Sequence, residues 1–382
     1  MQPPTGFRTF CASAALGALV SFGGAAPAAA EDFTVTMLSM SAYGPWFIAK
    51  EMGMAEGIDI DVKVIEDITA RNAGLSSGVI QCMMTTMDST VVTASAGVPV
   101  QHVAVPVMSY GLDEMVVDGA IQSDADLAGK TYAADYGFLN HMWMLLTLKK
   151  DGIPLDGANH SIMLPQDATA AFSSGALDVD VNFIPFSTNS AKREGAHVLK
   201  STFTDKTYER GLVSDSIACT TEWLEEKPEV AREVLRAWFE AVDWWKKNPE
   251  EGNAIIAEAL DWPEADVRLT QANTILLTID QNKGALGIGD GKPLCASIPT
   301  EAPQPDGEPS DWGELVGSDK DCEAGYLAST WQLFGDVYKE AGVIDDITPA
   351  SEGINSSIIE WLDAEAYDEK YDSNRWIGRV PL

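Results

Sequence analysis

The sequence is short of positive charge. It has 25 lysine and arginine residues against 58 aspartate and glutamate residues, and its formal net charge at pH 7 is −33. A chain of this sign repels phosphate backbones and anionic lipid surfaces. Nucleic acid and anionic membranes are therefore not expected as partners. The acidic excess is expected chiefly to keep the chain soluble, and a field that favours cationic ligands is the alternative interpretation.

Histidine is scarce as well. The four histidines are His102, His141, His160 and His197. None has a second histidine three or four positions away, so the usual spacing of a zinc site is absent. Neither a metal nor a cofactor is expected.

Cysteine is limited to five positions, one of which, Cys11, lies near the N-terminus. The other four allow three pairings. Cys295 and Cys322 flank a segment rich in Pro, Gly and Asp, so a disulfide between them is expected in an oxidising compartment. Cys82 and Cys219 lie in apolar, strand-like runs and are expected to be small buried residues rather than a redox pair.

Long apolar runs are absent after residue 30. Residues 1–30 carry one charge, Arg8, followed by a run of apolar and small residues and then Ala28-Ala29-Ala30. This pattern predicts a cleavable signal peptide over residues 1–30 and a periplasmic location. A membrane anchor is the alternative, but the run is short and glycine-rich for a span of about 20 residues.

Strand-like and helix-like segments alternate through most of the remaining chain, which predicts an α/β fold with mostly parallel sheets flanked by helices. The chain left after residue 30 exceeds the usual limit of about 250 to 300 residues for one core, so two lobes are expected. We predict one discontinuous lobe from residues 31–112 and 210–382, and a second from residues 113–209. The first lobe is expected to include a helical C-terminal extension and an aperiodic insertion over residues 284–320.

Binding sites of open α/β sheets lie beyond the carboxyl ends of the strands, where loops meet helix N-termini. Four loops occupy such positions, at residues 39–46, 85–89, 135–141 and 182–185. A cleft between two lobes would bring these loops together.

These loops also carry a family resemblance. Four segments, in chain order, are AYGPWFIAKEMGMAEGIDIDVKVI, LSSGVIQCMMTTMDSTVVTASAGVPVQHVA, DLAGKTYAADYGFLNHMWMLLTLKKDGI and AAFSSGALDVDVNFIPF. Together they resemble the taurine, sulfonate and nitrate type of periplasmic solute-binding protein. The resemblance implies a type II periplasmic-binding fold, a cleft that closes on a small-molecule solute, and delivery to the permease of an ABC transporter. It also implies a monomer without enzymatic activity.

The resemblance further implies which positions hold the solute. These ligand-binding positions are Tyr43, Gly44, Trp46, Thr86, Met87, Asp88, Leu139, Asn140, His141, Asn182, Phe183 and Pro185. His141 could instead hydrogen-bond a neighbouring loop. The nearby acids Asp113, Glu114 and Asp135 are expected to be solvated or hinge charges, and the alternative is that they support the residues that contact the solute.

This chain differs from sulfonate binders at positions that bear on the charge of the solute. Those proteins usually present small hydroxylated residues where this chain has Met87 and Asp88, and none of the four loops contains arginine. An anion needs guanidinium or N–H donors, whereas Asp88 supplies a carboxylate and Tyr43, Trp46 and Phe183 could face a cation.

A nitrogenous cation or a urea- or guanidine-like solute is therefore favoured, and taurine, an alkylsulfonate or nitrate is the alternative. The turn TTMDS is also similar to that of binding proteins encoded with urea or guanidine carboxylases. Asp88 could also simply cap a helix. Thiamine-precursor synthases share the fold family and give an enzymatic alternative, but nothing here resembles their cysteine-rich iron-binding run.

Overall fold

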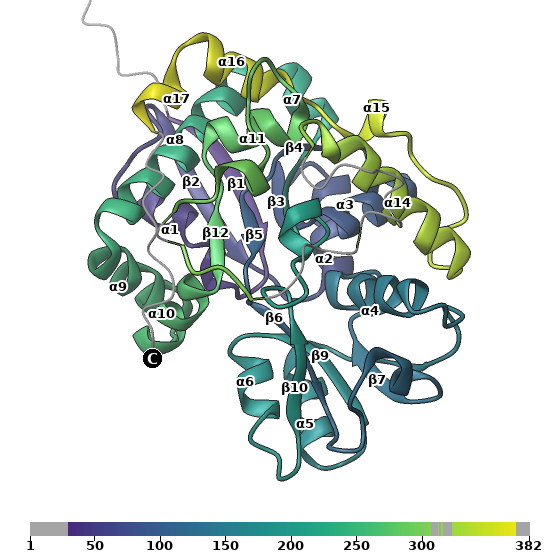
Figure 1. The fold of residues 1–382 in the computed structure, drawn as a ribbon. Coiled ribbons are helices and arrows are strands. Elements are labelled where there is room, and N and C mark those ends of the chain that lie inside the picture. The colour runs from purple at the N-terminus through teal and green to yellow at the C-terminus, as the bar shows by residue number, and fades with distance from the viewer. Residues whose placement is uncertain (1–29, 301, 307–311, 313–314, 316–322, 372–382) are drawn as a thin grey trace, which may run out of the picture.

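The computed structural model describes residues 30–300, 302–306, 312, 315 and 323–371 (Figure 1). The expected signal peptide lies outside the described residues, except for its last position, Ala30. No helix in these ranges is long and apolar enough to cross a membrane.

The described strands and helices follow the alternation that the sequence predicts. The strands are β1 (Glu31–Met37), β2 (Ile58–Val64), β3 (Cys82–Thr86), β4 (Val100–Ala104), β5 (Val107–Ser109), β6 (Asp113–Val117), β7 (Thr131–Ala134), β8 (Asn159–Ile162), β9 (Val179–Phe183), β10 (His197–Ser201), β11 (Asp215–Thr220) and β12 (Thr274–Leu276). The α-helices are α1 (Pro45–Glu51), α2 (Ile68–Ser76), α3 (Met87–Ser95), α4 (Leu139–Lys150), α5 (Pro165–Ser173), α6 (Phe186–Ser190), α7 (Thr221–Glu226), α8 (Pro228–Lys247), α9 (Pro249–Leu260), α10 (Glu264–Ala272), α11 (Ile279–Leu286), α12 (Leu294–Ser297), α14 (Tyr326–Glu340), α15 (Ala350–Gly353), α16 (Ser357–Ala364) and α17 (Tyr367–Lys370). Three short 3-10 helices are η1 (Ser41–Tyr43), η2 (Asp124–Leu127) and η3 (Thr207–Arg210).

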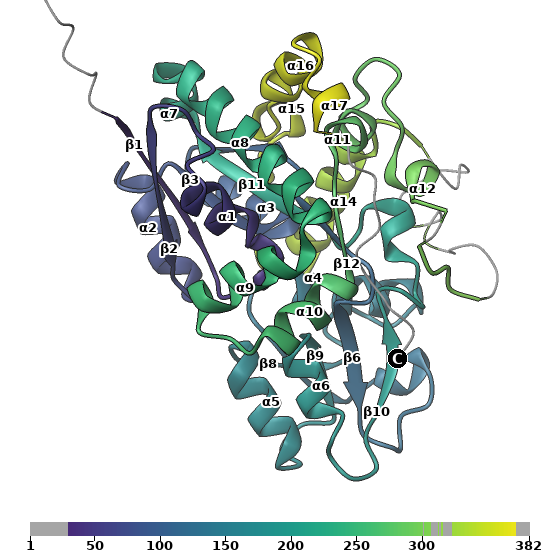
Figure 2. The same ribbon diagram turned by 90° about the vertical axis from the view of Figure 1, so that its left-hand side faces the viewer.

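Two five-stranded sheets form the two lobes seen in Figures 1 and 2. The first has the order β2-β1-β3-β11-β4 and the second the order β10-β6-β9-β7-β8. β1 runs parallel to β2 and β3, and β7 runs parallel to β8 and β9. β6 and β11, which follow the two crossings of the chain between the sheets, pair antiparallel with their neighbours. The predicted two-lobe α/β class is confirmed.

The two chain segments that cross between the sheets are joined by direct hydrogen bonds. Ser109 Oγ lies 2.7 Å from Thr202 Oγ1, and the N–H of Gly111 donates to the same Thr202 oxygen at 2.9 Å. Gly111 has a φ of 102°, which side chains disfavour. The outgoing and returning segments are thus held side by side between the lobes.

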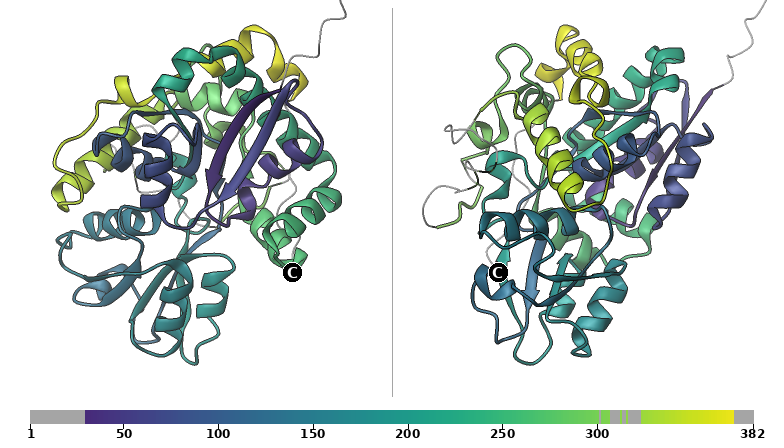
Figure 3. Two further views of the ribbon diagram at one scale, coloured as in Figure 1. Left: turned by 180° about the vertical axis from the view of Figure 1, so that it is seen from behind. Right: turned by 90° about the vertical axis from the view of Figure 1, so that its right-hand side faces the viewer.

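Helices of the C-terminal extension lie against the first lobe and reach the junction with the second (Figure 3). α14 contacts both α3 of the first sheet and α4 of the second. Within residues 284–320, the described residues include the end of α11, α12 and Trp312. The indole N–H of Trp312 donates to the carbonyl oxygen of Asp205 at 2.8 Å, so this segment contacts the returning crossing.

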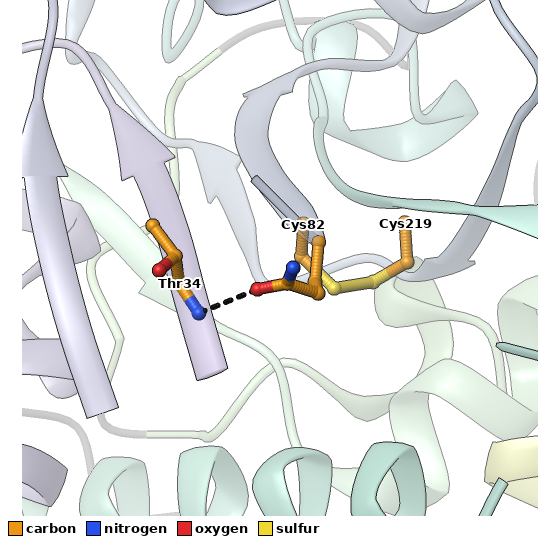
Figure 4. The surroundings of a disulfide bond; sticks show 4 residues. Thr34, Cys82 and Cys219 are labelled. Atoms are coloured by element: carbon orange, nitrogen blue, oxygen red, sulfur yellow. Dashed lines mark hydrogen bonds between the residues drawn. A yellow bond between two sulfur atoms is a disulfide. The ribbon is translucent and has the colours of Figure 1, made fainter. Parts of the chain in front are cut away.

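Cys82 and Cys219 are buried, as expected, and they form a disulfide, a pairing that the sequence left open (Figure 4). They are register partners on the adjacent antiparallel strands β3 and β11, with Cα atoms 4.0 Å apart. The strand pairing brings together residues separated by 137 positions, which local sequence does not reveal. Cys295 is also disulfide-bonded. Its expected partner Cys322 lies outside the described residues, so that pairing stays a prediction.

The Cys82–Cys219 bond closes a loop that contains the whole second sheet, and its removal should increase the entropy of the unfolded chain. We predict that a C82S/C219S double variant loses about 2 to 5 kcal/mol of unfolding free energy. Guanidinium denaturation of the variant and the wild type, without reductant so that Cys295 is unaffected, checks this. Equal midpoints and equal slopes would contradict it.

Candidate functional site

Residues from the two expected first-lobe loops occupy the carboxyl ends of β1 and β3. Tyr43 lies in η1, Gly44 precedes α1, and Asp88 is the second residue of α3. A Cβ on Gly44 would lie 2.2 Å from the side chain of Ile256, so the close approach of α9 requires glycine here. The helix begins after Thr86, which is its N-cap residue, so the alternative of Asp88 as the cap is wrong.

Asp88 is wholly buried. The Tyr338 hydroxyl of α14 donates to its Oδ2 at 2.6 Å, whereas Oδ1 has no hydrogen-bond partner among the described residues. Burial raises the pKa of Asp88 to about 6, and the Tyr338 hydrogen bond opposes the rise. A position in the first turn of α3 also favours the ionised carboxylate. The Thr86 side chain and the Ser89 N–H also favour the charged form of Asp88, and its Oδ1 is the oxygen without a hydrogen-bond partner in the described part of the chain.

Two further acids accompany Asp88. Asp113 and Asp215 are the first residues of β6 and β11, directly after the two crossings, and each is less than 8% exposed. Asp215 is the register partner of Thr86, two positions before Asp88. Burial raises the pKa of Asp113 to about 7, and the charge of Asp88 adds to the rise. We call Asp88, Asp113 and Asp215 the acid cluster.

Tyr43 and Asn140 contribute hydrogen bonds to the acid cluster. Burial, together with the charges of Asp113 and Asp88, raises the pKa of Asp215 well above its usual value, and a hydrogen bond from Tyr43 opposes this. Asn140 Nδ2, on the first turn of α4, donates to Asp113 Oδ1 over a long 3.4 Å. The cluster therefore joins groups from both sheets.

His141 stacks within an aromatic group in the second lobe. Its ring centroid is 4.1 Å from that of His160 and 5.6 Å from that of Tyr136. The Gly137 N–H donates to His141 Nδ1 over 3.4 Å. Burial and the neighbouring His160 lower the pKa of His141 to about 3. The imidazole is therefore neutral at physiological pH, and the loop hydrogen bond that the sequence offered as an alternative is present.

The polar side chain of the loop after β9, Asn182, is occupied by hydrogen bonds within its own lobe. Asn182 Nδ2 donates to the Pro165 carbonyl oxygen at 2.9 Å, and its Oδ1 accepts from the Phe183 N–H at 2.9 Å. Phe183 pairs edge-on with Phe186, with centroids 5.2 Å apart, and is the register partner of Asp113. Asn182 is thus engaged within its own lobe, whereas Phe183 lies beside the acid cluster.

Other sequence-selected positions serve packing. Trp46 is wholly buried between Phe33 and Trp238, at centroid distances of 5.5 and 5.1 Å, so its ring belongs to the core of the first lobe. Met87 and Leu139 are also buried in hydrophobic clusters. Thr86 Oγ1 donates to Ser89 Oγ at 2.9 Å, and Pro185 precedes α6. We do not retain Trp46 as a wall of the cleft.

Sequence reasoning missed several residues at this junction. Tyr338 lies 250 positions from Asp88 and has no local signal. Asp215 belongs to a run that reads simply as a strand, and Asp113 is buried rather than the solvated hinge charge expected. Arg71, in α2, is 1% exposed and lies outside the four loops.

The comparisons with known proteins agree with this architecture. A family model described as NMT1/THI5 like matches residues 42–252, more than half of the chain. The chain belongs to the NMT1/THI5-like family. The match covers η1, the acid cluster, α4 and the loop after β9.

Curated relatives of this NMT1/THI5-like chain carry little functional detail. Proteins of Brucella abortus (strain 2308) and Brucella melitensis, described as candidate binding proteins, are each 26% identical over 241 residues. The aligned region covers 61% of this chain and 73% of each relative.

Solved structures confirm the fold of periplasmic solute-binding proteins. The aliphatic sulphonate-binding protein SsuA of Escherichia coli is similar with a TM-score of 0.61 and 18% identity, over 85% of this chain and 92% of its own. The nitrate-binding protein NrtA of Synechocystis PCC 6803 gives a TM-score of 0.58 and 14% identity over 92% of both chains. The desulfurization enzyme DSZB also shares the fold, with a TM-score of 0.53 and 11% identity, over 87% of this chain and 99% of its own. The fold therefore serves both binding and catalysis.

The raised pKa of Asp113 predicts a pH-dependent stability of this NMT1/THI5-like protein. Between its ordinary pKa of 3.8 and about 7, the folded state keeps a proton that the unfolded state has lost. This group therefore lowers the unfolding free energy as pH rises through that window. Urea denaturation at about pH 5 and about pH 8 should show a smaller pH dependence for Asp113→Asn than for the wild type.

The matched control is Asp167→Asn, which changes an exposed acid in the first turn of α5. It should retain the wild-type pH dependence. An Asp113→Asn variant whose stability changes with pH as much as that of the wild type would contradict the prediction.

Proposed function

We propose that this protein is the extracytoplasmic solute-binding component of an ABC importer and that its solute is a small nitrogenous cation or a urea- or guanidine-like compound. The acid cluster carries this proposal. It gathers three buried carboxylates at the junction of the two sheets.

Carboxylates buried together cannot all ionise without a counterion, because each charge raises the energy of the others in a medium of low dielectric. A bound ammonium or guanidinium group would replace the protons that the cluster otherwise holds. It would also use the Asp88 Oδ1 atom, which has no partner among the described residues. Phe183, beside Asp113 in the sheet register, supplies an aromatic face that suits a cation.

Because the acids belong to both sheets, solute binding would change the arrangement of the two lobes. Asp88 and Asp215 belong to the first sheet and its helix, and Asp113 to the second. A cation held by all three would favour the closed arrangement of the lobes, and a permease could recognise that closed state. The proposed partners are thus a small solute and a permease, with the protein acting as a periplasmic monomer rather than as an enzyme.

Sulfonate and nitrate, the ligands named for SsuA and NrtA, are the alternative solutes. Neither would be favoured beside three carboxylates without additional donors. A thermal-shift screen of amines, guanidine, urea, alkylsulfonates without an amino group and nitrate separates the two classes, since a ligand at 100 times its Kd adds about 2.7 kcal/mol of stability. Incubation of each binding compound followed by chromatography would reveal turnover.

We predict that Asp88→Asn lowers the affinity for a cationic solute by at least about tenfold, because it removes a buried charge while keeping an acceptor for Tyr338. Isothermal titration calorimetry of the hit from the screen measures this loss. Asp167→Asn is the matched control and should bind as the wild type does. Unchanged affinity in a folded Asp88→Asn variant would contradict the proposal that Asp88 binds a cationic group of the solute.

A further inference from the structure

Helix α2 presents an arginine to the interior of the protein. Arg71 and Leu75, one helical turn apart, are its two buried residues, and Arg71 is 1% exposed. An inward position of a helix usually carries an apolar side chain. A guanidinium there requires a specific explanation.

The hydrogen bonding of Arg71 is incomplete. Its Nη1 donates to the carbonyl oxygen of Met84 at 3.2 Å, and its Nε–H has no partner among the described residues. No carboxylate in the described part of the chain lies within ion-pair distance of it. Buried charges in proteins are normally paired, because an isolated one loses its hydration without compensation. Arg71 is therefore a buried cation with donors to spare.

Arg71 lies at the same junction as the acid cluster, with Tyr43 between them. Burial and the charge of Asp215 raise the pKa of Tyr43, and the charge of Arg71 opposes this rise. Tyr43 in turn hydrogen-bonds to Asp215. Three acids lie within electrostatic reach of Arg71: Glu66 and Asp67, directly before α2, and Asp135 of the second lobe. Charged groups of opposite sign thus both act on Tyr43.

We infer that Arg71 binds an anionic group of the solute, so that the solute bound at this junction is a zwitterion with its cationic end at the acid cluster. This inference rests on the proposed function and narrows its solute class. A guanidinium can hold a carboxylate, sulfonate or phosphonate through two parallel N–H donors. The absence of arginine from the four loops favoured a cationic solute, but Arg71 lies in α2, outside those loops.

Matched sets of small probes test the inference. The zwitterions β-alanine, γ-aminobutyrate, guanidinoacetate and taurine are compared with cations that lack the anionic group, namely ethylamine, propylamine and methylguanidine. The corresponding anions are propionate, butyrate, acetate and ethanesulfonate. Calorimetric titration of the wild type should show at least one zwitterion binding at least about tenfold more tightly than its matched cation and its matched anion.

The Arg71→Gln variant separates the anionic end from the cationic end. It should lose at least about tenfold in affinity for the zwitterion and change little in affinity for the cation. The control Arg232→Gln alters an arginine of α8 that pairs with Glu229 and should leave both affinities unchanged. Cations that bind as tightly as zwitterions, with no effect of Arg71→Gln, would overturn the inference and leave the proposed function standing. Tight binding of anions alone, dependent on Arg71, would overturn both, as would failure of every probe at millimolar concentration.

A second measurement needs no ligand. An arginine kept for binding is unfavourable in the ligand-free protein, so Arg71→Met should raise the melting temperature of the ligand-free protein. A lower melting temperature would show that Arg71 supports the fold and would count against the inference.

Discussion

Burial of like charges where the chain crosses between its two lobes is the constraint on which the rest of the structure depends. Asp113 and Asp215 begin the strands that follow the crossings, and Asp88 lies in the first turn of α3. Strand pairing fixes the backbone of Asp113 and Asp215. The groups that hydrogen-bond these acids, Tyr338 and Asn140 among them, are neutral donors. The cluster must therefore hold protons or accept a cation.

The same constraint explains why the first lobe is reinforced. β11 returns from the second lobe and carries Asp215 at its start, and its pairing with β3 sets the position of that acid relative to Asp88. The Cys82–Cys219 bond joins these two strands. α14, which comes from the C-terminal extension, places Tyr338 against Asp88 and packs on α4 of the second lobe. Elements distant in sequence thus converge on one small region.

Local sequence predicted much of the fold. Pro45 and Pro228 begin α1 and α8, at the position where proline favours the start of a helix, and apolar residues that recur at helical spacing along α8 are buried. The position of Asp88 in the first turn of a helix at a strand end also followed from sequence. These features depend on residues within a few positions of one another, where propensity and periodicity act.

Features that depend on tertiary contacts could not be predicted from the local sequence. Cys82 and Cys219 are partners only through strand register, and Tyr338 reaches Asp88 only through the packing of α14. Trp46 lies at the expected place in the chain, but its ring turns toward Trp238, which the loop sequence does not determine. Arg71 lies on the buried face of α2, a helix with little apolar periodicity to identify that face.

Proton release on binding tests the central claim most directly. If a cation displaces protons from the acid cluster, calorimetric titration near pH 6.5 should give a binding heat that varies with the ionisation enthalpy of the buffer. The slope should correspond to release of at least about one proton per solute bound, because near pH 6.5 Asp113 and Asp88, with pKa values of about 7 and about 6, together hold about one proton in the ligand-free protein, and the raised pKa of Asp215 adds to this. A binding heat independent of the buffer, or uptake of protons, would contradict a cation held by these carboxylates.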